Sequence, residues 1–388
     1  MELTDGLPAS RRRWVMSCAV LGVMLAGLDS AIANIALPTI ARDLAATDAA
    51  TIWVVNSYQL AVTVCLLPAA ALGEIWGLKR IYGFGLILFT AASLACALSP
   101  TLPMLVASRL LQGAGGSCMA ALGGALVRSI YPRALLGRGF ATIALSVALS
   151  AALGPTLAAL VLSVAHWPWL FLINVPVGLV AVPLFLRVAP AGQRRHRRFD
   201  WRGTVLSAAT FGLIVTGVDG LGGEARGVAL AELAAGLLFG AGLFWQQSHQ
   251  ATPMLPLDLL RIRLFALSMA TSVCSYTAQI LAYVSLPFLF QVVLHRTAVA
   301  TGLLVTPWPL LVAFAAPLAG RLSDRYPAAV LGSLGLAVLA SGLTLLATMP
   351  AAPADWDVAW RMAICGVGFG FYQTPNNITL MTAGPPAR

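Results

Sequence analysis

A single acidic residue stands inside a long apolar run near the start of the chain. Asp29 lies within residues 14–37, and a run of that length is long enough to span a membrane. A charge at that depth is costly, so an ionisable group there is a candidate for function by default. Burial favours the protonated form of a carboxyl group, and a nearby arginine favours the charged form. Asp29 is therefore a candidate proton carrier, and the alternative is a structural ion pair that locks one conformation.

Arg109 is the basic residue that falls inside an apolar run rather than between two runs. At 1.5 Å per residue, Asp29 lies about 12 Å below the predicted outer end of its helix, and Arg109 lies about 9 Å below the same side. The two groups are therefore expected at similar depth, and they pair if their helices are neighbours. A coupling role and a structural role for Arg109 both stay open.

The composition predicts an all-α polytopic membrane protein. Of 388 residues, 59% are hydrophobic and 10% are charged, whereas a soluble domain carries about 25% charged residues. The net charge of +10 does not indicate nucleic acid binding, because the basic residues stand between apolar runs. The six cysteines and four histidines form no metal, disulfide or catalytic pattern. We expect no cofactor, no bound metal and no enzymatic activity.

Apolar runs recur along the whole chain and predict about twelve spans. The runs cover residues 14–37, 50–72, 80–98, 103–127, 138–163, 168–188, 203–220, 228–246, 264–293, 299–320, 329–349 and 358–383. Each is long enough for a helix that crosses the hydrocarbon core of a bilayer.

The basic residues between these runs predict the orientation. The side that holds the N-terminus carries 19 of them: Arg11, Arg12, Arg13, Lys79, Arg80, Arg128, Arg133, Arg138, Arg187, Arg194, Arg195, Arg197, Arg198, Arg202, Arg261, Arg263, Arg321, Arg325 and Arg388. The opposite side carries 4, which are Arg42, Arg226, Arg296 and Arg361. Lysine and arginine are enriched in cytoplasmic loops, so both termini are predicted to be cytoplasmic.

Two loops on the predicted cytoplasmic side share one pattern, in which a glycine at a helix end is followed by an acid and then by basic residues. The first loop contributes Gly73, Glu74, Gly77, Lys79 and Arg80, and the second, after Gly320, contributes Asp324 and Arg325. Such repeats mark secondary transporters built from two similar halves. These residues are predicted to form a cytoplasmic gate, and the alternative is a role in topology and turn formation.

The spacing of the two loops predicts extra helices between the halves. Gly73 and Gly320 are 247 residues apart, whereas six helices with short loops need about 200 residues. The surplus fits the runs at 203–220 and 228–246, which follow the basic stretch 193–198. We therefore predict a two-bundle fold with an N-terminal six-helix bundle (1–190), a basic linker with two extra helices (191–250) and an incomplete C-terminal bundle of about four of six helices (251–388).

Six segments carry recognisable motifs. They are LDSAIANIALP (28–38), WVVNSY (53–58), GEIWGLKR (73–80), RLLQGAGG (109–116), GP (154–155) and WPWLFLINVPVG (167–178). In this order they resemble the motifs of the fourteen-helix drug:proton antiporters, a branch of the major facilitator superfamily, and the predicted fold is the two-bundle fold of that superfamily. The chain departs from the pattern at Glu74, at Ala158-Ala159 and at Pro168, where Asp, a Gly pair and Arg are usual. It also ends at Arg388, about two helices before a fourteen-helix protein ends.

The resemblance implies roles for several residues. Asp29 and Arg109 are expected to line a central cavity and to couple transport to protons, and Gly154 and Pro155 are expected to form a hinge. Aromatic and amide side chains in the spans are candidates for contact with substrate, although Trp and Tyr near helix ends are more often interfacial. These candidates are Asn34, Tyr58, Gln59, Asn174, Tyr276, Gln279, Trp308, Phe371, Gln373 and Asn376.

The expected function is proton-coupled efflux of lipophilic, cationic drugs or toxic compounds across the bacterial inner membrane, by alternating access. The expected partners are the lipid bilayer, a small amphipathic substrate and protons, with the proton gradient as energy source, and the chain is expected to be monomeric. One alternative is export of an endogenous metabolite by the same mechanism. The other, suggested by the two missing helices, is a truncated membrane fragment that does not transport.

Overall fold

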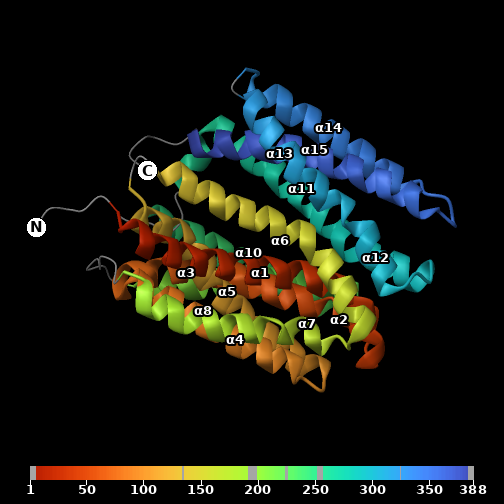
Figure 1. The fold of residues 1–388 in the computed structure, drawn as a ribbon, viewed down its shortest axis with the longest axis horizontal. Coiled ribbons are helices and arrows are strands. Elements are labelled where there is room, and N and C mark those ends of the chain that lie inside the picture. The colour runs from red at the N-terminus through yellow and green to blue at the C-terminus, as the bar shows by residue number, and fades with distance from the viewer. Residues whose placement is uncertain are drawn as a thin grey trace, which may run out of the picture. The chain divides into compact units, whose positions relative to one another are not determined.

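The fold is entirely helical in residues 6–132, 135–190, 199–222, 226–250, 257–323 and 325–382, which the computed structural model describes (Figure 1). The helices are α1 (Ala9–Asp43), α2 (Asp48–Thr51), α3 (Trp53–Trp76), α4 (Leu78–Ala97), α5 (Leu102–Ile130), α6 (Leu136–Val164), α7 (Pro168–Leu172), α8 (Asn174–Val188), α9 (Trp201–Gly220), α10 (Arg226–Ser248), α11 (Arg263–Phe288), α12 (Ala298–Val305), α13 (Pro307–Ser323), α14 (Ala328–Ala347) and α15 (Asp355–Thr382). A 3₁₀ helix, η2 (Leu257–Arg261), precedes α11, and a π-helix, η3 (Leu289–Val293), follows it. The basic stretch 193–198 and Arg388 lie outside the described residues.

Each predicted apolar run coincides with one helix or with consecutive helices, apart from a few residues at its ends, so the all-α polytopic fold class is confirmed. A helix satisfies its own backbone hydrogen bonds, which a bilayer core without water requires. Eleven helical stretches in the described part of the chain are long and apolar enough to cross a membrane. The twelfth predicted span corresponds to α15, which has 28 residues but is more polar. It carries Asp355, Asp357 and Arg361 in its first two turns and amide side chains farther along.

The contacts between residues divide the chain into two compact units. Unit 1 holds Met1–Ala26, Trp53–Ala144 and Phe171–Leu257, and unit 2 holds Gly27–Ile52, Leu145–Leu170 and Asp258–Arg388. Three α-helices, α1, α6 and α7, contribute residues to both units, and so does the 3₁₀ helix η2. The division into residues 1–190, 191–250 and 251–388 follows chain order and remains a prediction.

Glycines of α5 allow close packing of three helices in unit 1. A Cβ atom on Gly115 would lie 2.6 Å from the backbone nitrogen of Phe89 in α4. A Cβ atom on Gly113 would overlap the backbone of Tyr58 in α3. Small residues at such positions let helix backbones approach closely inside a membrane. The two glycines therefore place α5 directly against both α3 and α4.

Unit 2 contains the same arrangement in α13, α14 and α15. A Cβ atom on Gly368 would overlap the backbone of Leu339 in α14, and one on Gly366 would overlap the backbone of Trp308 in α13. These glycines follow those of α5 by 253 residues in both cases (366 − 113 and 368 − 115). The internal repeat is therefore present in the helix packing as well as in the loops.

Asp200 fastens the start of α9 to the end of α10 in unit 1. Its carboxylate accepts hydrogen bonds from the Gly203 backbone N–H at 2.9 Å and from the side-chain amides of Gln246, Gln247 and Gln250 at 2.9, 2.9 and 3.0 Å. Partial burial raises the pKa of Asp200, but these four hydrogen bonds outweigh burial and hold the pKa below its ordinary value. The two extra helices are thus joined by a carboxylate that stays ionised near neutral pH.

Candidate transport site

Arg109 is fully buried in α5 of unit 1. Its Nε donates to the carbonyl oxygen of Val54 at 2.9 Å, and its Nη1 donates to Gln112 Oε1 at 2.6 Å. The guanidinium also lies over the ring of Tyr58, 4.3 Å from the centroid, where the ring face attracts a cation. A buried charge is tolerated only with such partners. These contacts hold a fixed positive charge inside the helix bundle of unit 1.

The arginine contacts continue into a buried polar network. Gln112 Nε2 donates to Ser93 Oγ at 2.8 Å, and Asn174 Nδ2 donates to the same oxygen at 3.4 Å. The network joins α4, α5 and α8, so it fixes which end of the Gln112 amide faces Arg109. Asn174, a predicted cavity residue, is 2% exposed and belongs to this network.

Asp29 is 2% exposed and lies on α1 in unit 2. The residues on either side of it along the helix pack on α6. A Cβ atom on Gly27 would lie 2.8 Å from the nearest α6 side chain, and a Cβ atom on Gly154 would overlap Ala31. The segment that carries the carboxylate is therefore held against α6. Asp29 and Arg109 belong to different units, so their pairing remains a prediction.

The predicted hinge residues lie in a seam between α6 and α12 of unit 2. The carbonyl oxygen of Pro155 faces Gly302 so closely that a Cβ atom on the glycine would overlap it. One turn beyond, the hydroxyl groups of Thr156 and Thr306 share a hydrogen bond of 2.9 Å. Proline also removes one backbone hydrogen bond from α6. Small residues, one threonine pair and an interrupted helix thus meet at this seam, and the hinge role remains a prediction.

A small cavity of about 60 Å³ in unit 2 is lined by residues that include Asn34, Pro155 and Tyr283. Asn34 Nδ2 donates to the Ser30 carbonyl oxygen at 3.3 Å. Its Oδ1 is buried without a hydrogen-bond partner among the described residues. A cavity of this size has room for water, which such an oxygen needs. The predicted cavity residue Asn34 therefore lines a cavity in the same unit as Asp29.

Three predicted cavity residues meet between α11 and α15 of unit 2. Gln373 Nε2 donates to the Tyr276 hydroxyl at 2.6 Å, and Asn376 Nδ2 donates to Ser272 Oγ at 2.7 Å. The Tyr372 hydroxyl donates to the same serine oxygen at 3.3 Å. This cluster offers amide and hydroxyl groups that can exchange their mutual hydrogen bonds for bonds to a ligand.

The hydrogen bonds of this cluster do not include the other predicted cavity residues. Tyr58 lies under the Arg109 guanidinium, and Trp308 is fully buried with its ring 5.1 Å from that of Tyr283. Gln59 is exposed on α3, while Gln279 on α11 and Phe371 on α15 are half-buried. Of these, Trp308 serves the packing of unit 2.

The first predicted gate segment is helical rather than a loop: in unit 1, α3 continues to Trp76 and α4 begins at Leu78, so only Gly77 lies between them. Gly73 is buried, and a Cβ atom there would overlap the side chain of Leu122 in α5. Glu74 and Arg80 are exposed, and Lys79 is half-buried. In the second loop Arg325 is exposed after α13, whereas Asp324 lies outside the described residues. The gating role of both loops remains a prediction.

Gly77→Ala is expected to lower the free energy of unfolding by about 1–3 kcal/mol, because alanine is strained in this conformation. Gly77 precedes α4 with φ 98° and ψ 140°, which only glycine adopts readily. Thermal unfolding of the purified protein in detergent measures the effect. Gly123→Ala is the matched control, because a Cβ atom there meets nothing within 4 Å. Equal melting temperatures for Gly77→Ala and the control would contradict the prediction.

The sequence did not single out several residues that the structure places at these sites. Gln112 lies inside a quoted motif, but nothing in its type marked it as the partner of Arg109. Gln291, on the π-helix η3, donates to the Ile35 carbonyl oxygen at 2.9 Å within unit 2. Single π-helical turns are frequent at functional sites, yet an isolated glutamine in an apolar run carries no sequence signal. These contacts depend on how helices face each other.

The chain is similar over nearly its whole length to a known protein family and to individual transporters. Residues 19–388 match the Major Facilitator Superfamily. The "Uncharacterized transporter YebQ" of Escherichia coli (strain K12) is 49% identical over 99% of this chain and 85% of its own length. Riboflavin transporter RibZ of Clostridioides difficile (strain 630) is 28% identical over 97% of this chain and 83% of its own. Multidrug resistance protein Stp of Mycobacterium tuberculosis (strain CDC 1551 / Oshkosh) is 32% identical over 95% of this chain and 69% of its own length.

A solved structure agrees in fold. The crystal structure of peptide transporter POT in complex with sulfate has a TM-score of 0.68 at 14% identity, covering 96% of this chain and 83% of that one. At this identity the likeness concerns the fold alone. The sequence match, by contrast, spans nearly the whole chain. The chain therefore belongs to the major facilitator superfamily of membrane transporters.

Proposed function

We propose that this transporter exports lipophilic cations in exchange for protons across the bacterial inner membrane, as a member of the fourteen-helix drug:proton antiporter branch. The observation that carries the proposal is Asp29, a carboxylate that is 2% exposed within a membrane-spanning helix. An acid within a membrane span is costly, and the acids found there commonly belong to ion or proton pathways. Protons are the only energy source that the proposal requires, and both termini face the cytoplasm in it.

The proposed mechanism uses the two buried charges in turn. With the site open to the outside, Asp29 takes up a proton. With the site open to the cytoplasm, Asp29 releases the proton and its negative charge attracts a cationic substrate. Arg109 supplies a fixed positive charge that favours proton release whenever the two groups approach each other. The amides and hydroxyls around Tyr276 and Gln373 bind polar parts of the substrate, and the aromatic rings favour cations.

The relatives support two candidate substrate classes. The likeness to Multidrug resistance protein Stp favours foreign amphipathic compounds. The likeness to Riboflavin transporter RibZ favours an endogenous metabolite, which is the second candidate. The buried acid favours the first candidate, because a carboxylate in a membrane span binds a lipophilic cation better than a neutral compound.

Efflux from whole cells tests the proposal. Cells that express the chain and are loaded with a fluorescent lipophilic cation are expected to lose it faster than cells with an empty vector, and a proton uncoupler is expected to remove the difference. Unchanged efflux relative to empty cells would contradict export of cations. Faster efflux that survives the uncoupler would contradict proton coupling.

A further inference from the structure

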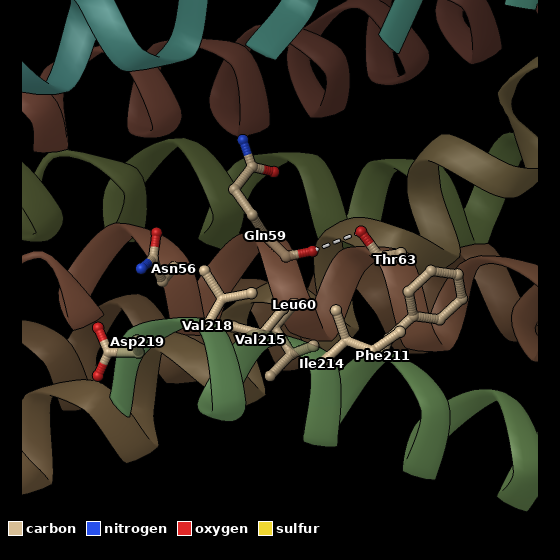
Figure 2. Close-up of a pocket in the computed structure, with 9 residues that line it drawn as sticks. All are labelled: Asn56, Gln59, Leu60, Thr63, Phe211, Ile214, Val215, Val218 and Asp219. Atoms are coloured by element: carbon tan, nitrogen blue, oxygen red, sulfur yellow. Dashed lines mark hydrogen bonds between the residues drawn. The ribbon is translucent and has the colours of Figure 1, made fainter. Parts of the chain in front are cut away.

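An open groove runs between α3 and α9 in unit 1, and the predicted cavity residue Gln59 is among those that line it. Its volume is about 390 Å³, which falls in the range of small-molecule sites. Four residues of α3 and five of α9 line it, and Figure 2 shows the two sets facing each other. Under the predicted orientation the groove follows the outer halves of both helices.

One end of the groove carries a carboxylate. Asp219 lies there near Asn56 (Figure 2), and its Oδ2 accepts a hydrogen bond of 2.8 Å from Trp53 Nε1. The other oxygen, Oδ1, accepts no hydrogen bond from the described residues. The indole thus fixes the carboxylate and places an aromatic ring beside it, and both groups attract a cation.

The rest of the groove is apolar. Leu60, Phe211 and Val215 line it beyond the acid. Thr63 donates its hydroxyl to the Gln59 carbonyl oxygen of its own helix at 2.8 Å, so this hydroxyl is already satisfied. In Figure 2 the Gln59 amide points away from the α9 side chains. The groove therefore combines one negative end with an uncharged, mainly hydrophobic body.

This pattern distinguishes between the possible occupants. An aminophospholipid brings an ammonium group and a phosphate, and the phosphate needs a basic partner. None of the nine lining residues is basic. A lipophilic monocation needs only the carboxylate and the apolar wall. Charge complementarity therefore favours the monocation.

We propose that the groove between α3 and α9 is a binding site for one lipophilic monocation, with the cationic centre at Asp219 and Trp53 and the apolar part against Leu60, Phe211 and Val215. Asp29 is not among the residues that line the groove. The proposal concerns binding, so it stands whether or not the bound cation is transported.

Binding of tetraphenylphosphonium to the purified chain in phosphatidylcholine nanodiscs tests the site, with protein-free discs as background. The measurement uses the Asp29→Asn protein, so that a cation bound near Asp29 does not contribute. Asp219→Asn in this protein is expected to weaken binding about fivefold, the upper range for an exposed ion pair. Glu232→Gln, which removes an acid on α10, is the matched control and is expected to leave binding unchanged.

Three further arms make the result decisive. Tetraphenylborate has the same shape and the opposite charge, and it is expected to bind better after Asp219→Asn. Val215→Trp, verified by thermal unfolding, is expected to fill the groove and to abolish binding of both ions. Binding that phosphatidylethanolamine discs suppress would assign the groove to a lipid and overturn the proposal. Unchanged binding in Asp219→Asn, or an equal loss in Glu232→Gln, would also overturn it.

Discussion

Asp29→Asn is expected to abolish the uphill export that a proton gradient drives, while the protein still folds. Asparagine preserves the shape of the side chain but has no ionisable proton. The carboxyl group is 2% exposed on α1, where its charged form is costly to bury. Removing that charge therefore spares the fold a desolvation cost, and it deletes the group proposed to carry the proton.

Proteoliposomes with an imposed pH gradient measure this effect directly. A fluorescent lipophilic cation outside and a pH-sensitive dye inside report substrate and proton movement in one experiment. The wild type is expected to accumulate the cation while the lumen loses protons, and Asp29→Asn is expected to do neither. Asp43→Asn, at the exposed end of the same helix, is the matched control and is expected to behave as the wild type. Proton movement that persists in Asp29→Asn would assign coupling to another group.

The helices were predictable from the sequence because a bilayer leaves few choices. The apolar run 103–127 is longer than the helices of most soluble proteins. The helix that contains it, α5, is Leu102–Ile130, so the predicted and observed ends differ by a few residues. Basic residues gather at one set of helix ends, as Arg128 does in the last turn of α5, and help to mark where those spans end. The π-helix η3 was not predictable, because the run 264–293 shows nothing that separates its last turn from α11. Local hydrophobicity thus determines that a helix forms, and it does not determine its finer geometry.

The hydrogen-bond partners of the candidate residues were harder to predict for a different reason. Tyr276 and Gln373 are 97 residues apart in the chain, and their hydrogen bond depends on how α11 and α15 are rotated about their axes. The same applies to Arg109, whose partners Val54 and Ser93 lie on two other helices, the second reached through Gln112. The residue types showed that polar or charged side chains stand within apolar spans, which is unusual in a membrane protein. Only the packing, set by glycines between helices, determines which of them meet.

Arg109→Met is expected to abolish transport and to lower the free energy of unfolding by no more than about 1–3 kcal/mol. Methionine removes the arginine donor from the oxygens of Val54 and Gln112, which is destabilising, but it also removes the desolvation cost of a buried charge, which offsets part of that loss. The internal repeat provides the precedent, because Met362 stands 253 residues after Arg109 on α15 (362 − 109) and is also fully buried. The fold therefore accepts a methionine at this place in one half. We infer that Arg109 is required for its positive charge and not for the packing of the helices.

Arg109→Lys separates the charge from its geometry. Lysine keeps the positive charge, but its ammonium group lacks the planar fork that reaches both the Val54 carbonyl oxygen and Gln112. We expect intermediate transport from it, and unchanged transport from Arg128→Met, the same kind of substitution at the exposed end of α5. Melting temperature and the initial rate of cation efflux are measured for all three variants. If Arg109→Met melts as the wild type and still transports, the charge is dispensable. If it melts far below the wild type, the network serves to hold α5 against α3 and α4.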